Sequence, residues 1–154
     1  MQKLANYEGS LETKLIINKP SNEVYTALHD LSKWTIYLPH VEKIDILYDD
    51  GKYQEFIMHV ISNNDTILKV RSVRKCNLVN HISYFQPEPP GFLLHHAGEW
   101  NINTLSPNET ELIAKHFWNK NEAAARDDIE ELLTSHANFA MSNWKQILES
   151  GQYK

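Results

Sequence analysis

The chain has 154 residues, of which 42% are hydrophobic and 23% are charged, and its formal net charge is −5. This size and composition are typical of one globular domain, so we expect residues 1–154 to form a single domain rather than a disordered or fibrous chain. The negative charge argues against nucleic acid and anionic lipid as partners, because both are bound by clustered Lys and Arg.

The first predicted element is a strand over residues 10–18, where apolar side chains recur with a period near two. Pro20 and Ser21 then offer an N-cap for a helix. Apolar residues follow at helical spacing, namely Val24, Ala27, Leu28 and Leu31. One short helix, or two, should end near Leu38.

Six further strands are predicted in the middle of the chain, because runs of alternating hydrophobicity are separated by turn signals such as DDGK, SNND and SPNE. The loop PEPPGF separates the fourth and fifth of them, since its prolines cannot donate to a strand ladder. These strands are expected at residues 41–48, 53–61, 67–76, 81–86, 94–105 and 110–118.

The rest of the chain is predicted to be one long amphipathic helix. Asn119 and Glu122 have the N-x-x-E spacing of a capping box, and neither Gly nor Pro occurs between them and Gly151. We expect the helix to run to about Ser150. Its apolar face would contain Ala125, Ile129, Leu132, Leu133, His136, Ala140 and Ile147.

This order of elements predicts an α+β fold. A curved antiparallel sheet of about seven strands would wrap around the long C-terminal helix, with two short helices after the first strand. A curved sheet and a straight helix can enclose more volume than their side chains fill, and the remaining space is then a pocket. We therefore expect functional residues on the concave face of the sheet.

The sequence also predicts a soluble, cytoplasmic protein. No stretch approaches the length of a membrane span, and residues 1–20 lack the apolar run and the cleavage site of a secretory signal. Cys76 is the only cysteine, so it cannot form an internal disulfide. We expect it to be buried and unreactive.

The strand over residues 67–76 places an arginine on its apolar side. Alternation puts Lys69, Arg71 and Lys75 on one face and Arg74 on the other. The neighbours of Arg74 on its face are Leu68, Val70, Ser72 and Cys76. A buried guanidinium keeps its charge and needs an acceptor. That acceptor would be a carboxylate elsewhere in the fold, water beyond the strand end, or an oxygen of a ligand.

Three histidines are expected to point inward. Counting from Trp100, His96 shares the inner face with Leu94 and Ile102, and His116 shares it with Leu112, Ala114 and Trp118. His136 lies on the apolar face of the long helix. Each is explained either as a hydrogen-bonded core imidazole or as a group for proton transfer or ligand contact. No metal-ligand spacing is present. The surface is expected to hold His59, His81 and His95.

Ser72 and several aromatic residues complete the candidates. Ser72 is either a satisfied interior hydroxyl or a group that positions water or substrate, and no nucleophile motif surrounds it. The aromatic residues are either core residues or flat walls on which a planar ligand can stack. They are Trp34, Tyr37, Trp100 and Trp118.

The sequence resembles the helix-grip (SRPBCC) superfamily, which includes START domains and the birch-pollen-allergen fold. The resemblance covers residues 11–149 and includes WTIYLPHVEKIDIL after the short helices and PPGFLLHHAGEWNI after the fifth strand. Within the superfamily the chain is most similar to bacterial polyketide aromatase/cyclases, and ubiquinone-binding START-like proteins come second.

One motif favours the cyclases, because Ser72-Val73-Arg74 matches a Ser-x-Arg that lines their cavity on the fourth strand. The chain also departs from the pattern. Leu68 and Val70 stand where that family has Trp, and Tyr37 is the nearest substitute for a family tyrosine. An asparagine on the family's long helix corresponds to Asn138 or, two residues on, to Ala140.

The resemblance implies an enzyme that directs aldol cyclisation and dehydration of a poly-β-ketone chain delivered by an acyl carrier protein, without a cofactor or metal. The implied catalytic residues are Arg74, Ser72, His96, His116 and Tyr37. The implied substrate contacts are Trp34, Met58, Trp100, Trp118, His136 and Asn138.

Two other functions stay open on the sequence alone. A carrier of a lipid, quinone or other hydrophobic aromatic molecule needs the same pocket but no proton transfer. A protein-binding module of this fold would instead use its outer surface and have a filled interior. The sequence does not decide between a monomer and a homodimer.

Overall fold

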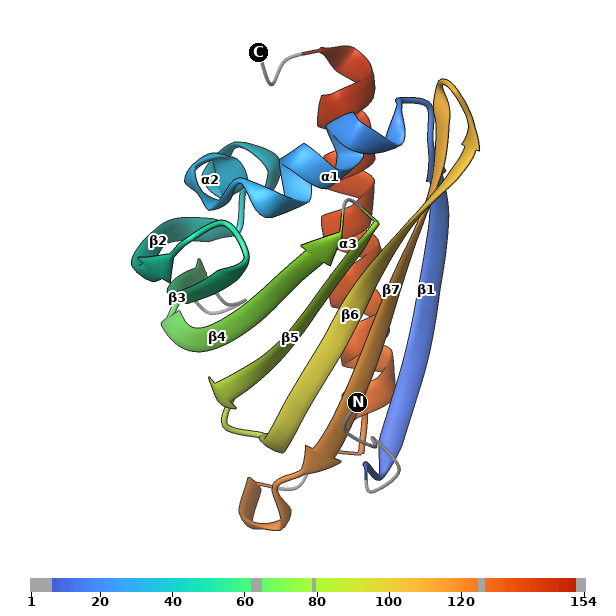
Figure 1. Cartoon of the computed structure of the whole chain (residues 1–154). Coiled ribbons are helices and arrows are strands. Elements are labelled where there is room, and N and C mark those ends of the chain that lie inside the picture. Colours follow the sequence, from blue (N-terminus) through green and yellow to red (C-terminus); the bar gives the residue numbers. More distant parts are fainter. Residues whose placement is uncertain (1–6, 62–64, 79, 125–126, 152–154) are drawn as a thin grey trace.

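Seven strands form one antiparallel sheet in the order β1-β7-β6-β5-β4-β3-β2 (Figure 1). The computed structural model describes residues 7–61, 65–78, 80–124 and 127–151. Six strands follow one another along the chain as neighbours, and β1 pairs with β7, so β1 and β2 are the two edges. The strands are β1 (Gly9–Ile17), β2 (Val41–Asp49), β3 (Tyr53–Ile61), β4 (Ile67–Leu78), β5 (His81–Glu88), β6 (Leu93–Ser106) and β7 (Glu109–Lys120).

The helices lie on one side of this sheet. The long helix α3 runs behind the strands in Figure 1 and contacts β1, β7 and α2. The short helices connect β1 to β2. The elements are α1 (Ser21–His29), η1 (Leu31–Lys33), α2 (Trp34–Tyr37), η2 (Glu122–Ala124) and α3 (Ile129–Ser150). This arrangement confirms the predicted α+β architecture, including the short helices after the first strand.

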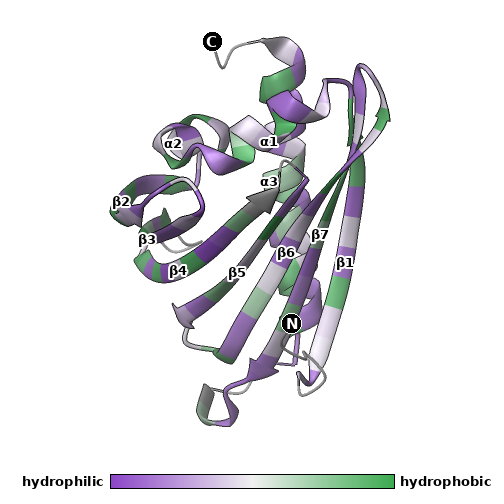
Figure 2. Ribbon diagram, viewed as in Figure 1, coloured by the Kyte–Doolittle hydropathy of each residue, from purple (hydrophilic) through white to green (hydrophobic). Residues whose placement is uncertain are grey.

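The core fills the space between the sheet and the helices. Hydrophilic and hydrophobic residues alternate along the strands (Figure 2). Because successive side chains of a strand point to opposite faces, hydrophobic side chains gather on the face that is turned toward α3. The larger cluster includes three tryptophans, Trp34, Trp100 and Trp144, whose rings meet edge to face at centroid distances of 5.4 and 5.6 Å. A smaller cluster near the start of α3 consists of Leu93, Trp118, Ile129 and Leu133.

The predicted start of the long helix was wrong. Asn119 lies inside β7, opposite His95 of β6, and its Oδ1 accepts a hydrogen bond from the backbone N–H of Glu8 at 2.8 Å. The ladder therefore uses the backbone that a capping box would need, and α3 begins only at Ile129. Ala125 lies outside the described residues. The buried face of the helix is Ile129, Leu133, Ala137, Met141, Trp144 and Leu148.

Two local predictions also differ from the structure. Pro20 occupies the N-cap position of α1 without a side-chain cap, and the Ser21 hydroxyl instead bonds the Thr104 hydroxyl at 2.7 Å. Pro87, placed in a loop by the sequence, lies inside β5. A proline is tolerated there because the pairing with β6 ends at Phe85, and the register with β4 is irregular.

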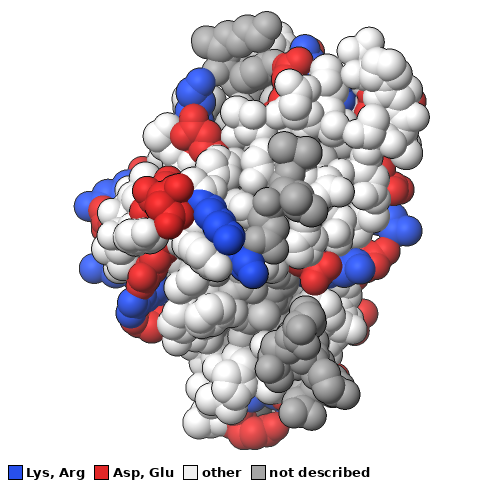
Figure 3. Space-filling model, in the orientation of Figure 1, with Lys and Arg blue, Asp and Glu red and all other residues white. Residues whose placement is uncertain are grey.

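On the face shown in Figure 3, positive and negative side chains lie next to one another. Such mixing does not create the concentrated positive field that binds phosphate backbones. No helix among the described residues is long and apolar enough to cross a membrane.

Candidate functional site

A row of residues crosses the concave face of the sheet from β3 to β7. Gln54 lies directly opposite Arg74, Arg74 opposite Tyr84, Tyr84 opposite Gly98, and Gly98 opposite His116. Residues that are directly opposite in neighbouring strands point to the same face of a sheet. We call these five residues the polar row. The antiparallel register alone brings them together from five different strands.

Arg74 is the charged group of the polar row and is only 2% exposed. Its Nε and Nη2 donate to Oε1 of Gln54 at 3.0 and 2.6 Å, and Nη2 also donates to the backbone oxygen of His29 at 3.2 Å. The guanidinium carbon lies 5.0 Å from the ring centroid of Trp34 and 5.6 Å from that of Phe56. Nη1 has no hydrogen-bond partner among the described residues.

Gln54 holds the guanidinium in place and is itself anchored. Its Nε2 donates to the backbone oxygen of His29 at 3.0 Å and to Oδ2 of Asp49 at 3.2 Å. The acceptor for Arg74 is therefore a neutral amide rather than the carboxylate or the bulk water considered above. Burial lowers the pKa of Arg74 to about 10, although Cys76, Tyr25 and Asp49 oppose this, and the group stays charged at neutral pH.

His116 of the polar row stacks on His96, which is not a member of the row. Their ring centroids are 5.5 Å apart and the rings are inclined by 7°. Nδ1 of His96 lies 2.6 Å from Oε1 of Gln86, and because an amide oxygen only accepts, this nitrogen carries the proton. Nε2 of His96 then presents a lone pair. Neither this atom nor Nδ1 of His116 has a partner among the described residues.

Both imidazoles are neutral at pH 7. Burial, with a smaller contribution from His116, lowers the pKa of His96 to about 3. Burial likewise lowers the pKa of His116 to about 4, with an added contribution from His136. An apolar environment disfavours the charged form of a base, which explains the direction of both pKa changes.

Tyr84 lies across the middle of the polar row. Its ring meets that of His96 edge to face at a centroid distance of 5.9 Å. A Cβ atom at position 98 would lie 2.4 Å from Oη of Tyr84, so only glycine leaves room for this ring. Burial raises the pKa of Tyr84, partly offset by Arg74, and the phenol is protonated at neutral pH. No hydrogen bond from its hydroxyl is found among the described residues.

At neutral pH this site therefore contains one cation, one phenol donor and two neutral imidazoles in apolar surroundings. An unpaired N–H on a buried cation is a strong donor, because hydrogen bonds with one charged partner are about twice as strong as neutral ones. The arrangement suits a ligand that is mainly apolar, carries oxygen atoms and is able to develop negative charge.

Several predicted placements are confirmed. Val70, Ser72, Arg74 and Cys76 are buried on one face of β4, while Leu68 at the start of the strand is 42% exposed. The inner face also contains the predicted His96, Trp100, His116 and Trp118. Cys76 is a free, buried thiol whose pKa is raised by burial.

The remaining aromatic candidates divide between two places. Trp34 contacts the guanidinium of Arg74, whereas Tyr37, 2% exposed, packs against Trp144 at a centroid distance of 6.1 Å. Met58 is partly buried against the core. Trp118 lies directly opposite His96 in the ladder and belongs to the smaller core cluster. Tyr37 is therefore outside the polar row.

Four predicted placements were wrong. His136 and Asn138 are exposed, because the buried face of α3 is rotated from the predicted one and contains Ala137 instead. Leu94 is 57% exposed, since an irregular register between Leu93 and His95 turns Leu93 inward. His59, expected on the surface, is 8% exposed and bonds Oδ2 of Asp45 through Nε2 at 2.7 Å.

Sequence analysis missed several members of the site, including Gln54, Tyr84, Gln86 and Gly98. Alternation along β3 could have predicted that Gln54 points inward, because it lies two positions from Phe56 and both are buried. The cross-strand register, which places them beside Arg74 and His96, is not present in any local pattern. Trp144 was also missed on the long helix.

Two hollows found among the described residues lie outside the concave face. One of about 200 Å³ is lined by Asn22, Glu23, Thr26, Ala27, Asp30, Lys33 and Tyr37. Another of about 480 Å³ is lined by Asp127, Glu130, Glu131, Thr134, Ser135 and Asn138. Neither reaches the polar row, where the rings of Trp34 and Phe56 pack against Arg74. Neither hollow is the pocket predicted on the concave face, and a guest molecule at the row would have to displace side chains.

A metal centre finds no support in this arrangement. Within the described part of the chain, no three His, Cys, Asp or Glu side chains gather closely enough to hold a metal ion. The stacked histidines contribute only two nitrogens, and one of the other ring nitrogens is bonded to Gln86.

No protein-family model and no curated protein matches the sequence. Solved structures do resemble it. The di-domain aromatase/cyclase StfQ from the steffimycin biosynthetic pathway is 22% identical, with a TM-score of 0.82 over 93% of this chain and 52% of that one. The Zhui aromatase/cyclase from Streptomyces sp. R1128 is also 22% identical, with a TM-score of 0.74 over 91% of this chain and 95% of that one.

A START superfamily protein from Mycobacterium smegmatis is 11% identical, with a TM-score of 0.75 over 92% of this chain and 97% of that one. The chain spans about half the length of the di-domain StfQ. These likenesses show that the chain has the helix-grip fold.

Proposed function

We propose that the protein binds a poly-β-ketone or a related oxygen-rich aromatic molecule on the concave face and directs its aldol cyclisation and dehydration. One observation carries the proposal: the buried guanidinium of Arg74 keeps an unpaired N–H within a row of neutral polar groups. The fold that the chain shares with proteins described as aromatase/cyclases supports the same function.

Arg74 would stabilise the negative charge that forms during enolisation. A ketone oxygen that accepts a hydrogen bond from Nη1 becomes an enolate oxygen when the adjacent C–H bond loses its proton. A donor that is already in place for the developing charge lowers the barrier most effectively. The rings of Trp34 and Phe56 would move aside to admit the substrate, and confinement between the sheet and α3 would then bring two distant carbons of the chain together and so select one ring.

His96 would transfer the protons. Its Nε2 lone pair can take the proton released on enolisation and return one when the hydroxyl leaves as water. A pKa near 3 makes the imidazole a weak base in the free protein. The negative charge of a forming enolate would raise that pKa, because a nearby anion favours the imidazolium. His116 is the second candidate for this role, and Ser72, two residues from Arg74 on the same face, would position the carbonyl group.

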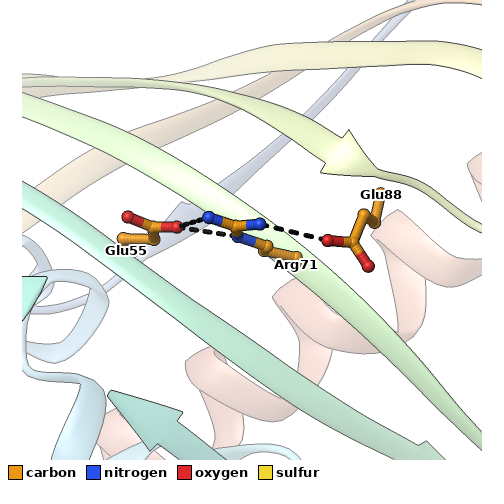
Figure 4. A network of polar contacts seen from close by, with 3 residues as sticks. All are labelled: Glu55, Arg71 and Glu88. Carbon is orange, nitrogen blue, oxygen red and sulfur yellow. Dashed lines mark hydrogen bonds and ion pairs between the residues drawn. The ribbon is translucent and has the colours of Figure 1, made fainter. Parts of the chain in front are cut away.

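The test is reconstitution with a minimal polyketide synthase whose acyl carrier protein delivers the chain, comparing products with and without this protein. We expect the wild-type protein to redirect the product profile and Arg74→Met to lose this effect by about a hundredfold or more. Arg71→Met is the matched control, because Arg71 lies on the same strand but on the outer face (Figure 4). An unchanged profile with wild-type protein across several chain lengths would refute catalysis.

A carrier of a hydrophobic aromatic molecule is the second candidate. The low pKa values of His96 and His116 favour it, because a carrier needs no base. The cluster of Trp34, Trp100 and Trp144 would serve either function. Under this alternative the protein binds a finished aromatic product, and neither the wild type nor Arg74→Met alters the products formed.

A further inference from the structure

Within the polar row, Tyr84 lies between Arg74 and the stacked histidines. It lies directly opposite Arg74 on one side and opposite Gly98 on the other. Its ring also contacts His96 edge to face. The phenol therefore lies between the guanidinium and the stacked imidazoles.

Gly98 leaves room for the end of the Tyr84 ring. A Cβ at this position would be 2.4 Å from Oη and 2.6 Å from Cζ of Tyr84, both well inside contact distance. The end of the phenol thus rests on the backbone of β6 in the place that any other residue would fill. The hydroxyl of Tyr84 therefore lies over β6 on the concave face.

The hydroxyl is available as a donor. Burial keeps the phenol protonated by raising its pKa, and Tyr84 and Arg74 lie close enough for each to affect the pKa of the other. No partner for Oη is found among the described residues, and part of the Tyr84 surface stays accessible. Tyr84 lies on the same face of the sheet as Arg74, because the two residues are directly opposite in neighbouring strands.

We propose that Tyr84 is a ligand-binding residue that donates its O–H to a carbonyl oxygen of a ligand on the concave face, and that Gly98 is the positioning residue that lets it do so. This rests on the proposed function, because it requires a ligand on the concave face. The role of Tyr84 also predicts a specificity, because the site should bind a flat molecule with a ketone more tightly than one of the same shape without the ketone.

The test uses two probes of nearly equal shape, 2-acetylnaphthalene and 2-ethylnaphthalene, which differ in the ketone oxygen. Their affinities are measured by equilibrium dialysis on the full chain. We expect the wild type to prefer the ketone and Tyr84→Phe to lower its affinity for the ketone about three- to tenfold, the usual value of a neutral hydrogen bond. Binding of 2-ethylnaphthalene should change by less than about twofold.

A spectroscopic readout separates ligand contact from a structural role. With a ¹³C-labelled carbonyl, the infrared C=O stretch of bound 2-acetylnaphthalene should lie at lower frequency than in an apolar solvent, and part of that shift should disappear in Tyr84→Phe. The variant keeps the ring that packs against Gly98 and His96. Tyr53→Phe is the matched control, since Tyr53 is 42% exposed at the start of β3, and it should retain the full shift.

The outcomes distinguish the two proposals. If the wild type binds neither probe, both the proposed function and the role of Tyr84 are overturned. If both probes bind but Tyr84→Phe keeps the ketone preference and the full infrared shift, the role of Tyr84 is overturned and the proposed function stands. Loss of both in Tyr84→Phe, with Tyr53→Phe unchanged, supports the assignment.

Discussion

Arg71 and Arg74 lie three residues apart on β4 and have opposite environments. Arg71 points to the outer face, where Glu55 accepts from its Nε and Nη2, and Glu88 accepts from Nη1 at 3.1 Å (Figure 4). Arg74 points inward and, within the described part of the chain, bonds only the neutral oxygens of Gln54 and His29. All three nitrogens of the outer guanidinium are satisfied by carboxylates, whereas the inner one keeps Nη1 unpaired.

The histidines repeat this contrast. On the outer face His59 bonds a carboxylate of Asp45 at 2.7 Å, and on the inner face His96 bonds the amide of Gln86. Burying a carboxylate beside a buried cation adds a second desolvation cost, whereas an amide supplies a lone pair at lower cost. The inner arrangement therefore leaves the positive charge of Arg74 without a carboxylate partner among the described residues.

The largest expected change in stability occurs when the pH is lowered. His96 and His116 have folded-state pKa values of about 3 and 4 against the usual 6.5, so the unfolded chain binds more protons below pH 6.5. The stability that their neutral forms contribute is complete above about pH 6.5 and is lost as pH falls toward 4 and 3. Because one pKa unit corresponds to about 1.4 kcal/mol, protonation of both histidines should lower the free energy of unfolding by several kcal/mol.

Urea unfolding measured between pH 7 and pH 4 checks this. The double variant His96→Gln, His116→Gln should flatten the dependence of the unfolding free energy on pH. His95→Gln, on the same strand but exposed, should keep the acid loss of the wild type, because both buried imidazoles remain. A double variant as acid-sensitive as the wild type would show that other groups cause the loss.

The second prediction compares two variants in which the side-chain partner of one arginine is replaced by leucine, at the adjacent positions 54 and 55. Gln54→Leu leaves the buried charge of Arg74 with one backbone acceptor and should lower the free energy of unfolding by about 3 kcal/mol. Glu55→Leu should cost less, because water can replace the lost partner of the half-exposed Arg71. Denaturant midpoints measure both, and equal losses would contradict the contrast between the two faces.

The third prediction concerns the space that Gly98 leaves. Gly98→Ala places a Cβ 2.4 Å from Oη of Tyr84 and 2.4 Å from the backbone oxygen of Lys115. We expect a loss of about 2 kcal/mol, as for other overpacked sites. Gly91→Ala, where an added Cβ meets nothing within 4 Å, should change the melting temperature little. A fully stable Gly98→Ala protein would mean that the strands separate easily at this point.

The smallest expected effect is on the outer face. Arg71→Met removes two surface ion pairs, and its denaturant midpoint should differ from that of the wild type by less than those of the other variants. The difference should disappear in about 1 M salt, where the screening length is about 3 Å. Persistence of the difference at high salt would indicate that the outer network is shielded from solvent.

Local patterns predicted much of this structure. All seven strands and the α+β class were correct, because alternation and turn residues act over a few neighbours. The inward facing of Arg74, His96 and His116 was also correct. Where a strand is irregular the parity fails, as the wrong placement of Leu94 shows. The prediction that Asn119 starts the long helix failed for a different reason. Asn119 pairs with β6 as part of a strand, and this pairing prevailed over the capping pattern.

In the regular parts of the strands the sequence by itself determined which residues face the interior, since the direction of a side chain there follows from its parity. The tertiary structure decided which of them meet. Gln54, Arg74, Tyr84, Gly98 and His116 are spread over 63 positions of the chain, and only the register between five strands puts them in one row. The register depends on contacts between residues distant in sequence, which no short stretch of sequence specifies.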